Sequence, residues 1–171
     1  MMYPLFSQIM HEVVKHGPGA FRAVCLINVA HNYGMEFTMC FGPSMEPTFS
    51  RAGDVLLLEH VSVMTNAIVR GDVVVSKSPT NPRHLVCKRV LGKGGDVIDV
   101  PKKGSFGGMV HVEVPHGYLW LQGDNKDNST DSRDYGPVPY GLIRGKAFAR
   151  VWPPRLFGWV ENEAWRSVPA V

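Results

Sequence analysis

Ser44 and Lys88 have the residue types that serve as nucleophile and general base in a serine hydrolase. Ser44 follows a strand-like run and lies in the segment GPSMEPT, residues 42–48. A serine at such a corner has two interpretations. Its hydroxyl either caps a short helix or stands near free backbone N–H groups, as an oxyanion site requires. Ser44 alone leaves both interpretations open.

The neighbours of Lys88 in the sequence favour its interpretation as a general base. Strand alternation places Val86, Lys88 and Val90 on one face, where burial removes water from the ammonium group and lowers its pKa. An unperturbed lysine titrates near ~10.4, so only a lowered pKa makes it a usable base near neutral pH. Arg89 stays protonated and is excluded from this role. An exposed lysine on an edge strand is the alternative interpretation.

Histidine bases and the usual serine elbow are disfavoured. None of the seven histidines has a context that points to catalysis. Glu46 also stands where the second glycine of a G-x-S-x-G elbow belongs. If Ser44 is a nucleophile, a lysine is therefore the better candidate for its base.

The polar run 123–136 invites a calcium interpretation because it holds four aspartates within eleven residues. The EF-hand pattern fails, since Lys126 occupies the third position counted from Asp124. A third ligand beside His111 and Glu113 is not evident, so we expect no metal and no cofactor. The run is expected either to be a structured loop, braced by an Asp131–Arg133 pair, or to be a plain solvated loop.

The sequence predicts that the segments around these residues are β-strands. The sequence has 18 glycines and 13 prolines in 171 residues, and they punctuate short apolar runs. We predict a mostly β domain with a coiled, barrel-like antiparallel sheet. The eight candidate strands are Glu36–Phe41, Asp54–Glu59, Asp72–Lys77, His84–Leu91, Val97–Val100, Val110–Val114, Tyr118–Gln122 and Lys146–Trp152.

The N-terminal part differs from the rest. Ala23–Met35 contains no Asp, Glu, Lys or Arg but is shorter than the ~20 residues that a spanning helix needs. A membrane helix and an amphipathic helix lying on a surface both remain open. We therefore divide the chain into an N-terminal segment 1–36 with a weak anchor at about 20–36, a catalytic domain 37–160 and a tail 161–171.

The net charge and the cysteine content restrict the expected partners and disulfides. The net charge is +3 with no basic run, so a nucleic-acid partner is not expected. The three cysteines, Cys25, Cys40 and Cys87, show no CxxC spacing and cannot all pair. We expect them to be buried free thiols.

Four segments in order resemble the sequence boxes of type I signal peptidases, which use a Ser/Lys dyad. The segments cover roughly residues 37–152 and are Gly42–Thr48, Arg70–Val75, Lys88–Gly92 with Gly95-Asp96, and Gly123–Asn125 through Asp131–Arg133. The endoplasmic-reticulum branch has histidine at the position of Lys88, so the resemblance disfavours that branch. Within the family, the short chain resembles the first of the two catalytic subunits of the mitochondrial inner membrane proteases.

The resemblance implies roles for individual residues. Ser44 would be the nucleophile and Lys88 the base, and the Ser44 N–H would donate to the oxyanion, because Gly42 stands where some bacterial members have a serine. Ser129 would hold Lys88. The supporting residues would be Asp124, Asp131 and Arg133, and the substrate-binding residues Met39, Phe41, Met45 and Cys87, with a core position an equal alternative for Met45.

The same resemblance implies location and partners. A weak N-terminal membrane anchor would hold the chain in the mitochondrial inner membrane, with the catalytic domain facing the intermembrane space. Its partners would be precursor proteins with presequences, a second protease subunit and the lipid membrane. Three alternatives remain: a non-catalytic scaffold subunit of a heterodimeric protease, a bacterial plasma-membrane signal peptidase, and a self-cleaving repressor-type protease. For the last, residues 1–41 are too few and show no helix-turn-helix pattern.

Overall fold

The computed structural model describes residues 17–19, 21–26, 34–101 and 108–161, and the chain forms two compact units, Met1–Met35 and Glu36–Val171. In the first unit, residues 17–19 and 21–26 are helical. No helix within these described ranges is long and apolar enough to cross a membrane. Residues 20 and 27–33 of the anchor predicted at about 20–36 fall outside the described residues, as does the tail 161–171 apart from Glu161.

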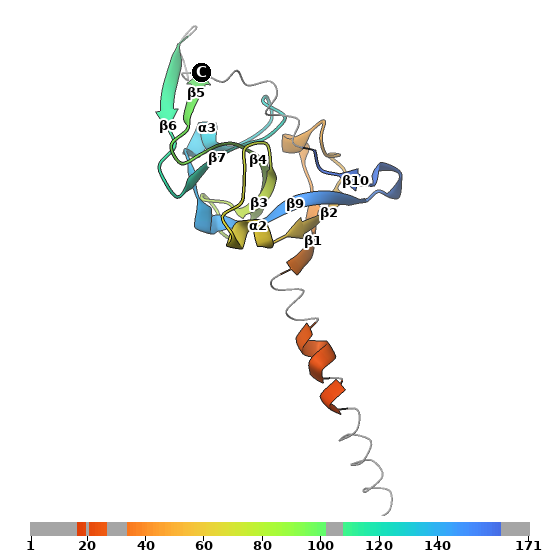
Figure 1. Ribbon diagram of the computed structural model, residues 1–171. Coiled ribbons are helices and arrows are strands. Elements are labelled where there is room, and N and C mark those ends of the chain that lie inside the picture. The colour runs from red at the N-terminus through yellow and green to blue at the C-terminus, as the bar shows by residue number, and fades with distance from the viewer. Residues whose placement is uncertain (1–16, 20, 27–33, 102–107, 162–171) are drawn as a thin grey trace, which may run out of the picture. The chain divides into compact units, whose positions relative to one another are not determined.

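The second unit is mostly β, as predicted (Figure 1). All eight predicted strands are present. The strands are β1 (Met35–Cys40), β2 (Asp54–Glu59), β3 (Val73–Lys77), β4 (Leu85–Lys93), β5 (Val97–Pro101), β6 (Met109–Glu113), β7 (Tyr118–Gln122), β8 (Val138–Pro139), β9 (Ile143–Trp152) and β10 (Gly158–Trp159).

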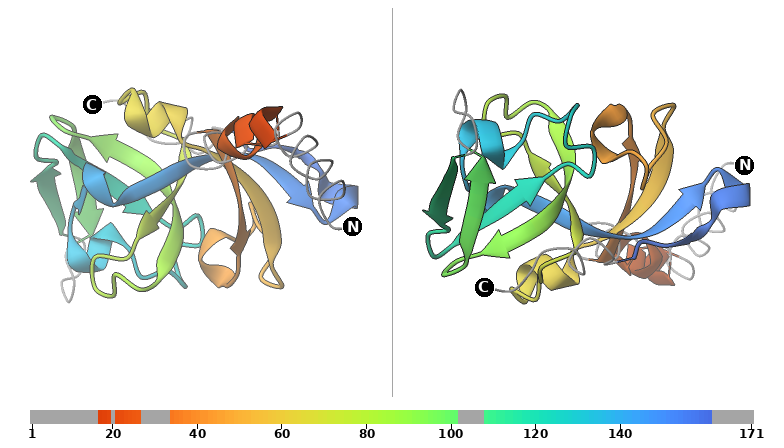
Figure 2. Two further views of the ribbon diagram at one scale, coloured as in Figure 1. Left: turned by 90° about the horizontal axis from the view of Figure 1, so that it is seen from below. Right: turned by 90° about the horizontal axis from the view of Figure 1, so that it is seen from above.

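The main sheet has the strand order β1-β2-β9-β3-β4-β7-β8, with β10 paired to β9. Its pairs β2–β9, β9–β3, β3–β4, β4–β7 and β7–β8 are antiparallel, and β5–β6 forms a separate two-stranded hairpin. Figure 2 shows that the main sheet curls instead of lying flat. The long strand β9 takes part in this curvature, because register shifts interrupt its ladders with β2 and with β3.

Short helical turns connect the strands. They are η2 (Pro43–Met45), α2 (Val61–Met64), α3 (Ser132–Tyr135), η3 (Tyr140–Leu142) and η4 (Pro154–Leu156). Each spans at most four residues, too few for helical periodicity to show in the sequence.

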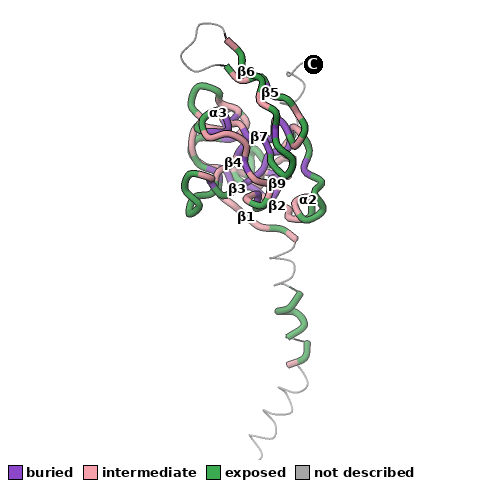
Figure 3. Tube along the Cα trace, turned by 90° about the vertical axis from the view of Figure 1, so that its left-hand side faces the viewer, coloured by how far each residue is buried: buried purple, intermediate pink, exposed green. Residues whose placement is uncertain are grey.

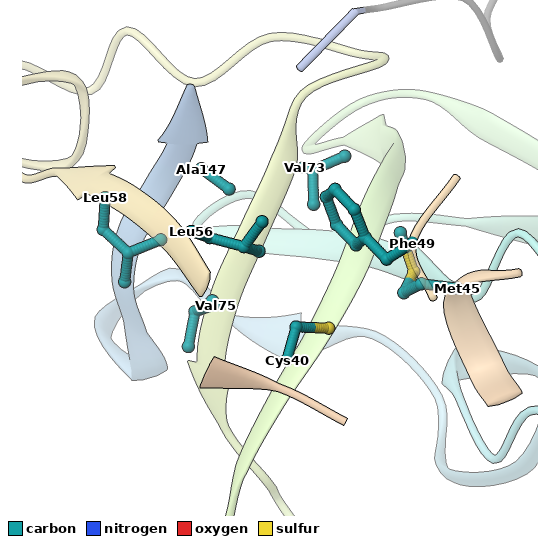
Figure 4. Packing of buried hydrophobic residues seen from close by; sticks show 8 residues of the cluster. All are labelled: Cys40, Met45, Phe49, Leu56, Leu58, Val73, Val75 and Ala147. Atoms are coloured by element: carbon teal, nitrogen blue, oxygen red, sulfur yellow. The ribbon is translucent and has the colours of Figure 1, made fainter. Parts of the chain in front are cut away.

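Buried residues gather inside the curl of the main sheet, as the colouring of Figure 3 shows. In β2 alternate residues are buried, which directs Leu56 and Leu58 into the core. The cluster around them joins the segments on either side of Ser44 to the sheet (Figure 4). Its members are Cys40, Met45, Phe49, Leu56, Leu58, Val73, Val75 and Ala147. The buried core thus fixes the segment around Ser44 against β2, β3 and β9.

Candidate active site

Ser44 lies in the tight turn η2, directly after β1. Gly42 begins this turn with φ 101°, a conformation that favours glycine. Pro43 has no N–H, so Ser44 carries the first backbone donor of the turn. Within the described residues the Ser44 N–H donates to no backbone carbonyl. It remains the candidate oxyanion donor of this turn.

Lys88 lies in β4 and is only 4% exposed. Burial lowers the pKa of Lys88, and the Asp131 carboxylate offsets part of this effect because it favours the charged form. The Nζ atom donates to Ser129 Oγ at 2.9 Å. The desolvated lysine expected from strand alternation is thus present, and the edge-strand alternative does not describe this residue.

Ser129 connects Lys88 to a braced carboxylate. Its Oγ donates to Asp131 Oδ2 at 2.7 Å, while Arg133 Nε and Nη2 donate to the two oxygens of Asp131, each at 2.9 Å. The Gly123 N–H adds a further bond to Asp131 Oδ2. Burial alone would raise the pKa of Asp131, but these donors outweigh it, so the pKa is lowered and the carboxylate stays charged.

The Ser44 turn packs against this same loop. Asn125 N–H donates to Ser44 O at 3.0 Å, and Asn125 Nδ2 donates to Pro43 O at 3.1 Å. Gly123 lies so close that a Cβ atom there would clash with Ser44 O and with Ser129 Oγ. Residues 123–131 therefore bring the nucleophile turn and the partner of Lys88 to one place.

Asp124 belongs to a second brace in the same region. Arg89 is 3% exposed, and its Nε and Nη2 donate to Asp124 at 2.8 and 2.7 Å. Thr48 Oγ1 donates to the same carboxylate, and Arg89 Nη1 reaches Gly71 O at 2.8 Å. This network ties the segment after Ser44 to β4, to the turn before β3 and to the loop after β7.

The predicted substrate-binding residues differ in their exposure to solvent. Met39 and Phe41 are exposed, whereas Cys87 is partly buried against the core cluster. Met45 is 1% exposed and packs in that cluster, which agrees with the core position that was the alternative for this residue (Figure 4). The expectation that all cysteines are buried is wrong for Cys25, which is exposed.

Sequence reasoning missed the roles of Arg89, Thr48 and Asn125. A signal for Arg89 existed, because a charged residue inside an apolar strand requires a partner when it is buried. The identity of that partner, 35 residues away, could not be read from the pattern.

Together, a serine with a free N–H and a desolvated lysine held by a serine–carboxylate chain can support nucleophilic attack on a carbonyl. The sequence profile of the family "Signal peptidase, peptidase S26" matches residues 13–106 and 102–152. The chain belongs to this family. It is thus an endopeptidase of the serine type, as predicted from the four sequence boxes.

Individual relatives agree with this family. Human mitochondrial inner membrane protease subunit 1 is 46% identical over 136 residues, which cover 80% of this chain and 81% of the relative. Mitochondrial ATP-independent inner membrane protease subunit 1a of Arabidopsis thaliana is 48% identical over 79% of this chain and 81% of its own length. A solved signal peptidase I from Enterococcus faecalis has a TM-score of 0.39 and 22% identity, covering 46% of this chain and 95% of that one. The predicted location at the mitochondrial inner membrane is confirmed by the mitochondrial relatives.

Proposed function

We propose that this S26 peptidase removes sorting presequences from proteins delivered to the mitochondrial intermembrane space, with Ser44 as nucleophile and Lys88 as general base. The observation that supports it most is the state of Lys88, which is buried, has a lowered pKa and is bound to Ser129 beside the Ser44 turn. A surface lysine would have none of these properties.

The proposed reaction has two halves. Neutral Lys88 Nζ accepts the proton of Ser44 Oγ while Oγ attacks the scissile carbonyl carbon, and the Ser44 N–H stabilises the oxyanion. Lys88 then protonates the leaving amine, which departs and leaves an ester on Ser44. Lys88 next takes a proton from water, the hydroxide attacks the ester, and Ser44 recovers its proton as the acid product leaves.

Ser129 positions Lys88, and the Asp131–Arg133 pair positions Ser129. The Oγ of Ser129 fixes the direction of the Nζ lone pair, because it lies between Lys88 and a carboxylate that stays charged. Asp124 holds the surrounding segments through Arg89, without contacting the reacting atoms.

An extended substrate fits the edge of the sheet. Among the described strands, β1 pairs only with β2, so its other edge is free to accept a further strand. Met39 and Phe41 lie exposed at the end of this strand, next to Ser44. We assign them to the peptide segment that precedes the scissile bond.

Membrane and subunit partners complete the proposal. The N-terminal segment would anchor the chain, with Lys15 and Arg22 on the matrix side and the catalytic domain in the intermembrane space. The relatives are named as subunit 1 of a protease, which supports a second subunit as partner. Their mitochondrial origin favours this proposal over a bacterial plasma-membrane enzyme.

The deciding experiment compares cleavage of a presequence-bearing precursor by the wild-type chain, Ser44→Ala and Lys88→Met in detergent, with the second subunit absent and then present. We expect each variant to lose at least about 10³-fold in kcat/KM while remaining folded. Ser62→Ala and Lys77→Met are matched controls outside the site and should keep wild-type rates. If Ser44→Ala and Lys88→Met also keep wild-type rates, the chain is a non-catalytic scaffold and the dyad is wrong.

A further inference from the structure

Two thiols meet beside the dyad, and the proteolytic mechanism uses neither. Cys40 ends β1, four residues before Ser44, and Cys87 directly precedes Lys88 in β4. Cys40 is a buried member of the core cluster, and Cys87 packs against that cluster. Each thiol is the largest influence on the pKa of the other, as expected of side chains that lie next to each other.

The contact arises from the curl of the sheet. In the strand order, β2, β9 and β3 lie between β1 and β4, so backbone pairing does not join the two cysteine-bearing strands. The two strands reach the same core cluster because the sheet curls. Cys40 belongs to that cluster, as Figure 4 shows, and Cys87 packs against it. The third thiol, Cys25, is exposed and belongs to the other unit of the chain.

We propose that Cys40 and Cys87 form a disulfide that ties β1 to β4 and so fixes the strand before the nucleophile against the strand that carries the lysine. Thiols that lie next to each other at one core cluster need only a small approach to reach bonding distance. The bond closes a loop of about 50 residues, long enough for a substantial restriction of the unfolded chain.

The chemistry requires a disulfide donor, for which oxidised glutathione is sufficient. Cys40, the thiol with the lowered pKa, loses its proton and attacks a donor sulfur, which releases one glutathione thiolate and leaves a mixed disulfide. Cys87 then loses its proton, attacks the Cys40 sulfur and releases the second glutathione as thiolate. The two protein thiols lose two electrons and two protons, and the donor is reduced to two glutathione thiols.

The electrostatics support Cys40 as the attacking thiolate. A hydrogen bond from the Cys87 thiol lowers the pKa of Cys40, whereas the same contact and burial raise the pKa of Cys87. The positive charge of Lys88 favours the thiolate form at both positions.

The test uses the full chain in detergent with Cys25→Ser, which leaves only the two relevant thiols. The protein is incubated with oxidised glutathione or with dithiothreitol, blocked with a maleimide, denatured and digested with trypsin without reduction. Cleavage after Arg22, Arg51, Arg83 and Lys88 yields the fragments 23–51 and 84–88. We expect oxidation to join these two fragments and dithiothreitol to separate them. Maleimide on both cysteines after oxidation, or a separate glutathione adduct on each, would overturn the proposal.

Thermal unfolding provides a second, independent measurement. Oxidation should raise the Tm of the wild-type chain and of Cys25→Ser by about 5–10 °C. It should leave Cys40→Ala and Cys87→Ala unchanged. An equal rise in these two variants would contradict the cross-link. Neither measurement depends on the peptidase activity of this chain, so both outcomes are separate from that of the proposed function. The fragment map remains decisive if a variant fails to fold.

Discussion

Lys88 ends a hydrogen-bonded chain that runs through Ser129 to Asp131, so its proton affinity depends on charges of both signs. Burial is the largest influence and lowers the pKa of Lys88. The Asp131 carboxylate raises it and the Arg133 guanidinium lowers it. The two charged neighbours can therefore be tested by substitutions with opposite expected signs.

We predict that Asp131→Asn and Arg133→Gln move the acidic limb of the pH–activity profile in opposite directions. The proposed base must be neutral, so kcat/KM rises as pH rises through the pKa of Lys88. Removing the Asp131 charge lowers that pKa further and shifts the limb to lower pH. Removing the Arg133 charge raises it and shifts the limb to higher pH. The profiles of kcat/KM against pH measure both shifts.

A merely structural role for Asp131 and Arg133 would give a different result. Both substitutions would then reduce the rate at every pH and leave the limb where it is. Lys126, which offers Arg133 only its backbone carbonyl, supplies a control, because Lys126→Gln removes a nearby exposed charge without touching the chain from Lys88 to Asp131. Its profile should match that of the wild type.

At the scale of elements, the buried Arg89–Asp124 pair joins β4 to the loop after β7, with Thr48 attached to the same carboxylate. Asp124→Ala leaves the Arg89 guanidinium buried without this partner. We expect the free energy of unfolding to fall by about 3–5 kcal/mol. Equilibrium urea denaturation, followed by the fluorescence of the buried Trp120, measures the change.

The Arg144–Glu36 pair is the matched control for this prediction. It is also bidentate, but its arginine is 44% exposed. Arg144→Ala should therefore cost only about 0–1 kcal/mol. Equal losses for Asp124→Ala and Arg144→Ala would show that burial does not strengthen the Arg89–Asp124 brace.

Elements also show what the sequence could and could not predict. Alternation of apolar residues located all eight longer strands, but β8 and β10 have two residues each and show no period. β9 begins at Ile143, before the predicted start at Lys146. The strand continues through Gly145, where a Cβ atom would press on the backbone of Glu59. The candidate dyad and the Asp131–Arg133 pair were found because they lie within short motifs.

No comparable sequence signal predicted which residues far apart in the chain contact each other. Asp124 finds Arg89 and Cys40 finds Cys87 only because the sheet curls, and curvature depends on bulges and packing that no local pattern reports. The burial of Met45 follows from the same packing, which is why the sequence left a substrate position and a core position equally open for it.

At the scale of the whole molecule, the two compact units separate a proposed anchor from the peptidase domain. Val24 and Leu26 are exposed apolar residues on the helical stretch 21–26 of the first unit. If this stretch enters the bilayer, Val24→Asp with Leu26→Asp costs about 2.5–3.5 kcal/mol for each charge placed at the membrane centre. We expect alkaline carbonate to leave the wild-type chain in the membrane pellet and to release the double variant.

The same two charges placed on the second unit should not release the chain. Val97 and Met109 are exposed apolar residues of the β5–β6 hairpin, so Val97→Asp with Met109→Asp matches the first double variant in chemistry and exposure. Retention of this control and release of the first variant locate the membrane attachment in the N-terminal unit. Retention of both double variants would mean that Val24 and Leu26 do not contribute to anchoring. Release of both would mean that apolar surface of the peptidase domain also holds the chain to the bilayer.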